Sequence, residues 1–232
     1  MVYPNVQAYD RGVMFNPDGR LFQVEYAKEA VRKGATSVGM TTKEGVVFVA
    51  HKNIVEPLSV PMTIQKVFRV DAHIGATYSG MMADGIHIID QARSYAQNHR
   101  LVYDDVKSVE AVTKDLSTDM MQATMYGGVR PYAVSVLIGG FDTEPRLFEL
   151  GPGAEFSGYK ADAIGVGKKV ALEMLVKEYK DGMSTDDAIA LGVKIIKKIS
   201  ETKLTKENMD IGYVSKGNNF VMLTPEEIAK YL

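Results

Sequence analysis

The alternation of apolar and polar positions predicts a chain of grouped strands and grouped helices. In several segments the apolar residues recur at every second position or form short continuous runs, which is typical of strands. Between the first two of these segments, Lys43-Glu44-Gly45 predicts a hairpin turn. The predicted strands span residues 36–42, 46–51, 66–71, 73–79, 132–139, 146–150, 161–165, 209–214 and 220–223.

Other segments repeat their apolar residues at helical spacing. Val112, Leu116 and Met120 recur every four residues, which places them on one face of a helix. Thr224 followed by Pro225 is a typical helix start, with a capping residue and a proline at the first helical position. The predicted helices span residues 20–33, 82–100, 105–124, 168–180 and 185–201, with a terminal helix that begins after Thr224.

The order of these elements predicts an α+β fold. Strands and helices come in groups, which argues against an alternating parallel sheet. Two antiparallel sheets stacked face to face, with a helix pair on each outer side, would form a four-layer αββα sandwich in this order. We find no linker within residues 1–232, so we predict a single domain, and we interpret residues 1–12 as a loose tail.

The predicted N-terminal helix, residues 20–33, is unusual because its apolar residues cover more than one face. Phe22, Val24, Tyr26 and Val31 do not share a single stripe. A helix that is apolar on two sides is usually packed on both. The second side is therefore expected to contact another subunit.

Composition excludes several classes of function. The chain has a net charge of −2 and a pI of about 6.1, which is not the basic footprint of a nucleic-acid-binding protein. No apolar run reaches the ~20 residues that span a bilayer. The chain lacks cysteine, and its four histidines do not have the spacing of metal ligands. We expect a cytoplasmic protein with no metal, cofactor, nucleic acid or membrane partner.

One glycine-rich segment, Gly165-Val166-Gly167-Lys168, invites comparison with a phosphate-binding loop. Such a loop needs glycine where Asp162 stands and serine or threonine where Lys169 stands. We therefore interpret the segment as a strand-to-helix turn.

Several motifs, in order along nearly the whole chain, resemble the proteasome α-subunit family of the archaeal type. The first is the sequence FNPDGRLFQVEYA from Phe15 to Ala27, preceded by Tyr9-Asp10-Arg11. The further motifs are Glu29-Ala30-Val31, Gly34-Ala35-Thr36, Tyr126-Gly127-Gly128-Val129-Arg130-Pro131-Tyr132, Tyr159-Lys160-Ala161 and Ala163-Ile164-Gly165. The resemblance implies the N-terminal-nucleophile hydrolase fold, an αββα sandwich in which a long N-terminal helix distinguishes α from β subunits.

The resemblance also implies a role. Seven α subunits would form the outer ring of a 20S core particle, stacked on proteasome β subunits. This ring would control the entrance of unfolded protein substrates and bind the C-terminal tails of activator ATPases. The α subunit itself would be a non-catalytic part of a threonine-type endopeptidase complex.

The residues at the expected catalytic positions support a non-catalytic subunit. In this superfamily the nucleophile is the first residue of the mature chain, and its amine assists as a base. By resemblance the nucleophile position falls on Ala35, and the early carboxylate falls near His51. Two alternatives stay open: a self-processed hydrolase that exposes Thr36 by cleavage after Ala35, and an interaction scaffold that has lost the proteasome role.

By resemblance, activator binding falls on Lys66, with Gly34 and Met81 lining the same pocket between adjacent subunits. A lysine ammonium has three hydrogen-bond donors and would bind the C-terminal carboxylate of an activator. From the residues alone, Lys66 could equally be a solvated lysine at a strand end, and Gly34 a helix stop.

A gate and a pore loop are also implied by the resemblance. The gate would consist of the tail, residues 1–12, held by Tyr9, Asp10, Pro17 and Tyr26. Only three residues, Gly12-Val13-Met14, separate Arg11 from Phe15, where the family usually has four, so the cluster partners could differ.

The pore loop would be Tyr126, Gly127, Gly128 and Val129, in which the two glycines permit a tight turn. Arg130 follows this loop. It could anchor the loop to a neighbouring subunit or cap the preceding helix.

Overall fold

Two five-stranded antiparallel sheets form the centre of the molecule. This computed structural model describes residue 9 and residues 14–54, 58–217 and 219–232. The first sheet has the strand order β10-β9-β2-β1-β8, and the second has the order β3-β4-β5-β6-β7. The strands of the first sheet are β1 (Ser37–Thr41), β2 (Gly45–His51), β8 (Ala161–Ile164), β9 (Met209–Ser215) and β10 (Val221–Met222). Those of the second are β3 (Val67–Asp71), β4 (Ile74–Gly80), β5 (Val134–Phe141), β6 (Pro145–Leu150) and β7 (Phe156–Gly158).

The two sheets pack face to face through apolar side chains. In β2, Val46, Phe48 and Ala50 point into the space between the sheets, while Val47 and Val49 point to the helices on the other side. This explains why β2 is apolar at nearly every position, since both faces of the first sheet are covered. The hairpin at 42–45 is confirmed, and Thr42 closes it by accepting the Gly45 N–H at 3.0 Å.

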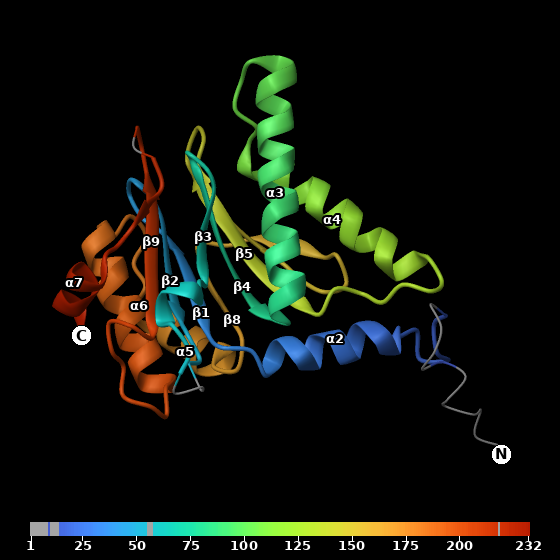
Figure 1. Cartoon of the computed structure of the whole chain (residues 1–232), viewed down its shortest axis with the longest axis horizontal. Helices are drawn as coiled ribbons and strands as arrows, with labels where there is room; N and C mark the ends of the chain where they lie inside the picture. Colours follow the sequence, from blue (N-terminus) through green and yellow to red (C-terminus); the bar gives the residue numbers. More distant parts are fainter. Residues whose placement is uncertain (1–8, 10–13, 55–57, 218) are drawn as a thin grey trace.

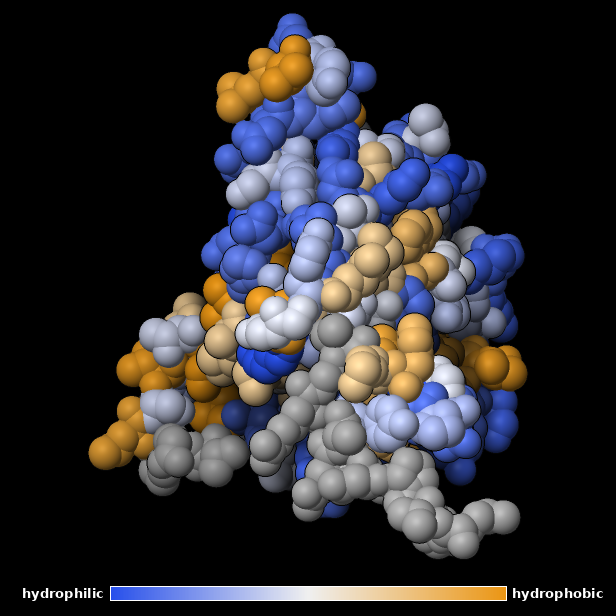
Figure 2. Space-filling view, turned by 90° about the vertical axis from the view of Figure 1, so that its right-hand side faces the viewer, coloured by the Kyte–Doolittle hydropathy of each residue, from blue (hydrophilic) through white to orange (hydrophobic). Residues whose placement is uncertain are grey.

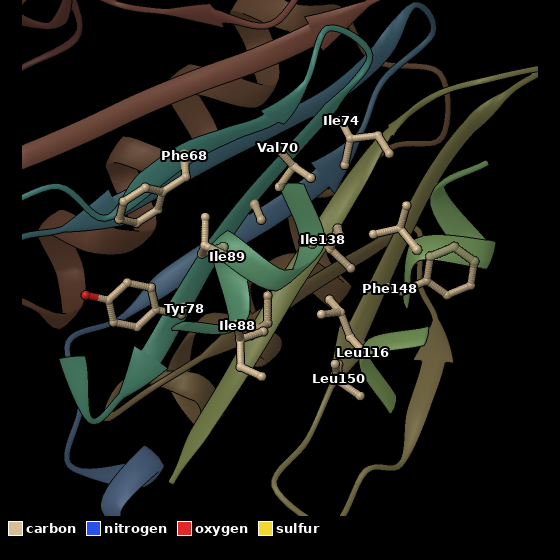
Figure 3. Close-up of a cluster of buried hydrophobic side chains, with 14 of the residues drawn as sticks. Phe68, Val70, Ile74, Tyr78, Ile88, Ile89, Leu116, Ile138, Phe148 and Leu150 are labelled. Atoms are coloured by element: carbon tan, nitrogen blue, oxygen red, sulfur yellow. The ribbon is translucent and has the colours of Figure 1, made fainter. Parts of the chain in front are cut away.

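A helical layer covers the outer face of each sheet (Figure 1). Helices α3 (Met82–Tyr103) and α4 (Val109–Met125) pack on the second sheet, and α5 (Lys168–Glu178) and α6 (Thr185–Ile199) pack on the first. Figure 3 shows the cluster between α3, α4 and the second sheet, where Ile88, Ile89 and Leu116 meet Tyr78, Ile138 and Leu150. The predicted four-layer αββα sandwich with an added N-terminal helix is confirmed.

That N-terminal helix is α2 (Phe22–Arg32), which runs across one end of the sandwich (Figure 1). Its buried residues are Val24, Ala27 and Val31, on the face towards the sheets. Tyr26 lies on the other side, is 51% exposed and stacks on Phe22. Phe22 and Tyr26 therefore lie apart from the face of α2 that packs on the sheets.

Some boundaries differ from prediction. Helix α3 continues to Tyr103, where Asp104 ends it in the left-handed conformation with a φ of 52°. Helix α4 begins at Val109 and not at residue 105, because the hydroxyl of Ser108 caps it by accepting the Ala111 N–H. Strand β7 and the 3₁₀ turn Pro61–Thr63 were not predicted. The chain ends in α7 (Pro225–Ile228), with the predicted Thr224 cap, and the 3₁₀ turn Ala229–Tyr231.

Candidate functional site

The three residues predicted to bind an activator come together at the C-terminal end of β4. The Lys66 ammonium lies 4.1 Å from the ring centroid of Tyr78 on this strand. Gly34 packs on the next two residues of the strand: a Cβ added to Gly34 would lie 2.3 Å from Ser79 Oγ and 2.5 Å from the Gly80 nitrogen. Met81 follows directly. The structure thus places Lys66, Gly34 and Met81 around one short segment.

Lys66 is buried in the single chain, with only 7% of its surface exposed. It stands immediately before β3, and its backbone N–H donates to Oδ2 of Asp210 on β9 at 2.7 Å. The other carboxylate oxygen of Asp210 lies 2.9 Å from the Lys52 ammonium. In the described part of the chain, no carboxylate forms an ion pair with the Lys66 ammonium, whose recorded side-chain contact is the Tyr78 ring.

Burial lowers the pKa of Lys66 to about 8, although the negative charge of Asp210 acts in the opposite direction. Desolvation disfavours the charged form of a lysine, and the Tyr78 ring replaces only part of the lost hydration. Burial and the nearby Lys66 charge together lower the pKa of His51. A carboxylate partner would therefore stabilise the charged form of Lys66.

Gly34 and Met81 are both more exposed than Lys66. Gly34 is half-buried and accepts the Val166 N–H through its carbonyl, which ties the end of α2 to the turn after β8. Met81 is 46% exposed, and its Sδ accepts a contact from Arg130 at 3.3 Å. Gly34 is both a helix stop and a position where a larger residue would displace the end of β4.

The predicted pore loop follows α4. Tyr126 is 65% exposed, and a Cβ added to Gly127 or Gly128 would meet open space. Gly128 has a φ of 88°, which favours glycine. The loop lies at the end of the molecule where the described N-terminal part begins (lower right in Figure 1).

Figure 2 shows, face-on, the side of the molecule that lies to the right in Figure 1. Hydrophobic residues lie in its lower half and along its middle, and a small group lies at the top.

Arg130 anchors the pore loop to α3 of its own chain. Its guanidinium donates to both carboxylate oxygens of Asp84, at 2.6 and 2.7 Å. Asp84 also accepts the Ala133 N–H at 2.8 Å, and the hydrogen bonds from Arg130 lower the pKa of its carboxyl. The sequence suggested a neighbouring subunit or a helix cap as the role of Arg130, and neither alternative named Asp84. Arg130 and Asp84 lie 46 positions apart, so their pairing could not be inferred from the local sequence.

The predicted gate residues are only partly described. Asp10 lies outside the described residues, as does most of the tail at 1–12, and Tyr9 is half-buried. Pro17 is exposed in the predicted turn, which closes with a hydrogen bond from Gly19 N–H to the Asn16 carbonyl at 2.9 Å. The turn precedes α2 and Tyr26 lies within this helix. A cluster of Tyr9, Asp10, Pro17 and Tyr26 stays a prediction.

The residues at the expected catalytic positions occupy ordinary structural roles. Ala35 connects α2 to β1 and has no nucleophilic atom. The Thr36 hydroxyl accepts the Gly167 N–H at 3.0 Å, and the Thr36 carbonyl accepts the His51 N–H at 3.0 Å. Thr36 is therefore buried and engaged, which disfavours the self-processed hydrolase.

Other kinds of site find little support among the described residues. They contain no group of three or more histidine, cysteine, aspartate or glutamate side chains that could hold a metal ion. Nor do they include a helix that is both long and apolar enough to cross a membrane. Lys168, at the end of the glycine-rich turn, donates to both carboxylate oxygens of Glu149 at 2.7 Å.

Comparison with known proteins agrees with this geometry. Residues 31–214 match the family model for proteasome subunits, and residues 9–30 match the model for the N-terminal signature of A-type proteasome subunits.

Three similar proteins, each named "Proteasome subunit alpha", illustrate the match. One from Archaeoglobus fulgidus is 44% identical, covering 97% of this chain and 92% of that protein. One from Methanosarcina mazei is 42% identical, covering 97% and 91%. One from Thermococcus sibiricus is 39% identical, covering 99% and 88%. The fold, the N-terminal signature and these similarities together establish that the chain belongs to the proteasome subunit family, as an α-type member.

Proposed function

We propose that this chain is a non-catalytic structural and gating subunit of a 20S proteasome core in the cytoplasm. Seven α subunits form the outer ring, which stacks on β subunits and admits unfolded protein substrates to the proteolytic chamber. The C-terminal tails of activator ATPases bind at Lys66, Gly34 and Met81. Their binding shifts the ring toward an open state.

The observation that carries the docking proposal is the environment of Lys66. Its ammonium is desolvated over the Tyr78 ring. A carboxylate that reaches this ammonium is itself shielded from water, so the attraction is much stronger than at an exposed lysine. Gly34 and Met81 are partly exposed and thus accessible to an approaching tail.

The gating role is supported by the loop from Tyr126 to Val129. Its tip is exposed and built on two glycines, while its base is fixed by the Arg130–Asp84 pair. A rigid base with an exposed aromatic tip suits a loop that narrows an opening. The tail at 1–12, with Tyr9, Asp10, Pro17 and Tyr26, would close the opening in the resting state.

The non-catalytic role is supported by Ala35 at the nucleophile position and by the engaged hydroxyl of Thr36. A lysine does not perform acyl transfer without a nucleophile, and Ala35 does not supply one. Lys66 would therefore bind the tail carboxylate and take no part in catalysis.

The docking proposal predicts a pH-dependent preference for free carboxylates. Two peptides of the same sequence, one with a C-terminal carboxylate and one with a C-terminal amide, would be titrated against the assembled α ring. We expect the acid to bind more tightly below pH 8 and to lose this advantage as the pH rises above about 8, where free Lys66 loses its proton. The tail carboxylate stays ionised throughout.

The amide peptide is the control, and its affinity should stay constant between pH 7 and pH 9. His51 does not interfere in this range, because its lowered pKa keeps it neutral. Equal affinity of the acid and amide peptides at pH 7 would contradict carboxylate docking at Lys66.

A further inference from the structure

Asp210 is a buried charged residue in an otherwise apolar strand, and its two carboxylate oxygens have separate partners. Oδ2 accepts the backbone N–H of Lys66 at 2.7 Å, and Oδ1 lies 2.9 Å from the Lys52 ammonium. Only 7% of Asp210 is exposed. Burying a charge is costly unless it is paired and hydrogen-bonded, so both partners are needed to hold the carboxylate there.

These contacts join the two sheets at Lys66. Asp210 belongs to β9 of the first sheet, while Lys66 leads into β3, the edge strand of the second. The strands lie close together two residues further on, where a Cβ added to Gly212 would be 3.0 Å from a methyl carbon of Val67. Because side chains two apart on a strand share a face, Asp210 and Gly212 both face the second sheet.

Lys52 extends the same contacts to the segment before Lys66. Its ammonium donates to the carbonyl of Pro61 at 3.4 Å as well as pairing with Asp210. Asp210 and Lys52 therefore fix both the turn Pro61–Thr63 and the residue from which the Lys66 side chain emerges.

We infer that Asp210 is a positioning residue for activator binding, which fixes the backbone of Lys66 and keeps its ammonium charged for a tail carboxylate. This inference rests on the proposed docking function. The charged and titratable groups around Lys66 are Asp210 and Lys52 from the first sheet, His51 at the end of β2 and Tyr78 from β4. Among them, Asp210 is the group whose charge favours the protonated lysine, against the burial that disfavours it.

The test uses Asp210→Asn, which keeps an oxygen to accept the Lys66 N–H and removes the charge. In assembled core particles, the titration midpoint of Lys66 would be read from the pH dependence of trace acetylation, with peptide mass mapping. We expect the midpoint to fall by about one pH unit, and the acid peptide to bind about fivefold more weakly at pH 8, because the protonated fraction of Lys66 falls by that factor. Amide-peptide affinity should not change, which a purely structural role of Asp210 would not predict.

Lys216→Met is the matched variant, because it removes the charge of an exposed lysine beyond the end of β9. The Lys66 midpoint should not change in this variant. An unchanged midpoint in Asp210→Asn would overturn the inference.

Failure of the docking function itself would look different. The unmodified core would then bind acid and amide peptides equally, while the acetylation midpoints would still decide whether Asp210 controls Lys66.

Discussion

Replacing Lys66 by alanine should abolish activator-stimulated protein degradation by a core particle assembled from this chain and a β partner. The substitution removes the cation that would meet the tail carboxylate, and truncating one partner of a buried charge pair costs about 2–5 kcal/mol. We therefore expect tail peptides to bind about 100-fold more weakly. Degradation of an unfolded protein with activator and ATP is the measurement.

Two controls accompany this prediction. Hydrolysis of very small peptides by the same particles should be unchanged, because such peptides do not need an opened gate. Lys216→Ala removes an exposed lysine at the far end of β9, beyond Ser215, and should leave stimulation intact. Stimulation that survives in Lys66→Ala would show that the pocket is assigned to the wrong residue.

Replacing Asp84 by alanine is expected to give the largest loss of stability among the site residues. The change removes the bidentate partner of Arg130 and leaves the buried Ala133 N–H without its acceptor. Because the Arg130 guanidinium is half-exposed, we discount the ion pair and expect a loss of about 2–3 kcal/mol in the free energy of unfolding. Urea unfolding of the chain measures it.

Asp90→Ala is the matched control, since Asp90 pairs with Arg93 on the surface of the same helix. It should change stability by less than about 1 kcal/mol. The sign of the pH effect is a second check. The folded-state pKa of Asp84 lies below the ordinary value of 3.8, so its contribution is present above pH 3.8 and is lost as the pH falls through the lower folded value. Equal losses in the two variants would contradict the anchoring role of Asp84.

The sequence was most informative where periodicity is strong. Strand β2 and helix α6 lie within two residues of their predicted ends, because their apolar residues recur at strand and helix spacing. Ser184 also caps the start of α6. Strand β7 has only three residues, too few for a period to appear. The gap between α3 and α4 was misplaced because Asp104 ends one helix in a conformation that spacing does not reveal.

The site was predictable only in part. Resemblance pointed to Lys66, Gly34 and Met81, and the structure brings them together. Asp210 was missed because its partner Lys66 lies 144 positions away, and pairing across two sheets cannot be inferred from local pattern. The available signal was a charge inside the apolar segment Met209–Val214, which requires a buried partner.

Native mass spectrometry of the purified chain, alone and mixed with a proteasome β subunit, is the most direct test of the central claim. The account predicts a seven-membered ring of full-length subunits that joins the β partner. A chain that stays monomeric in both samples, or one shortened to begin at Ala35 or Thr36, would contradict it.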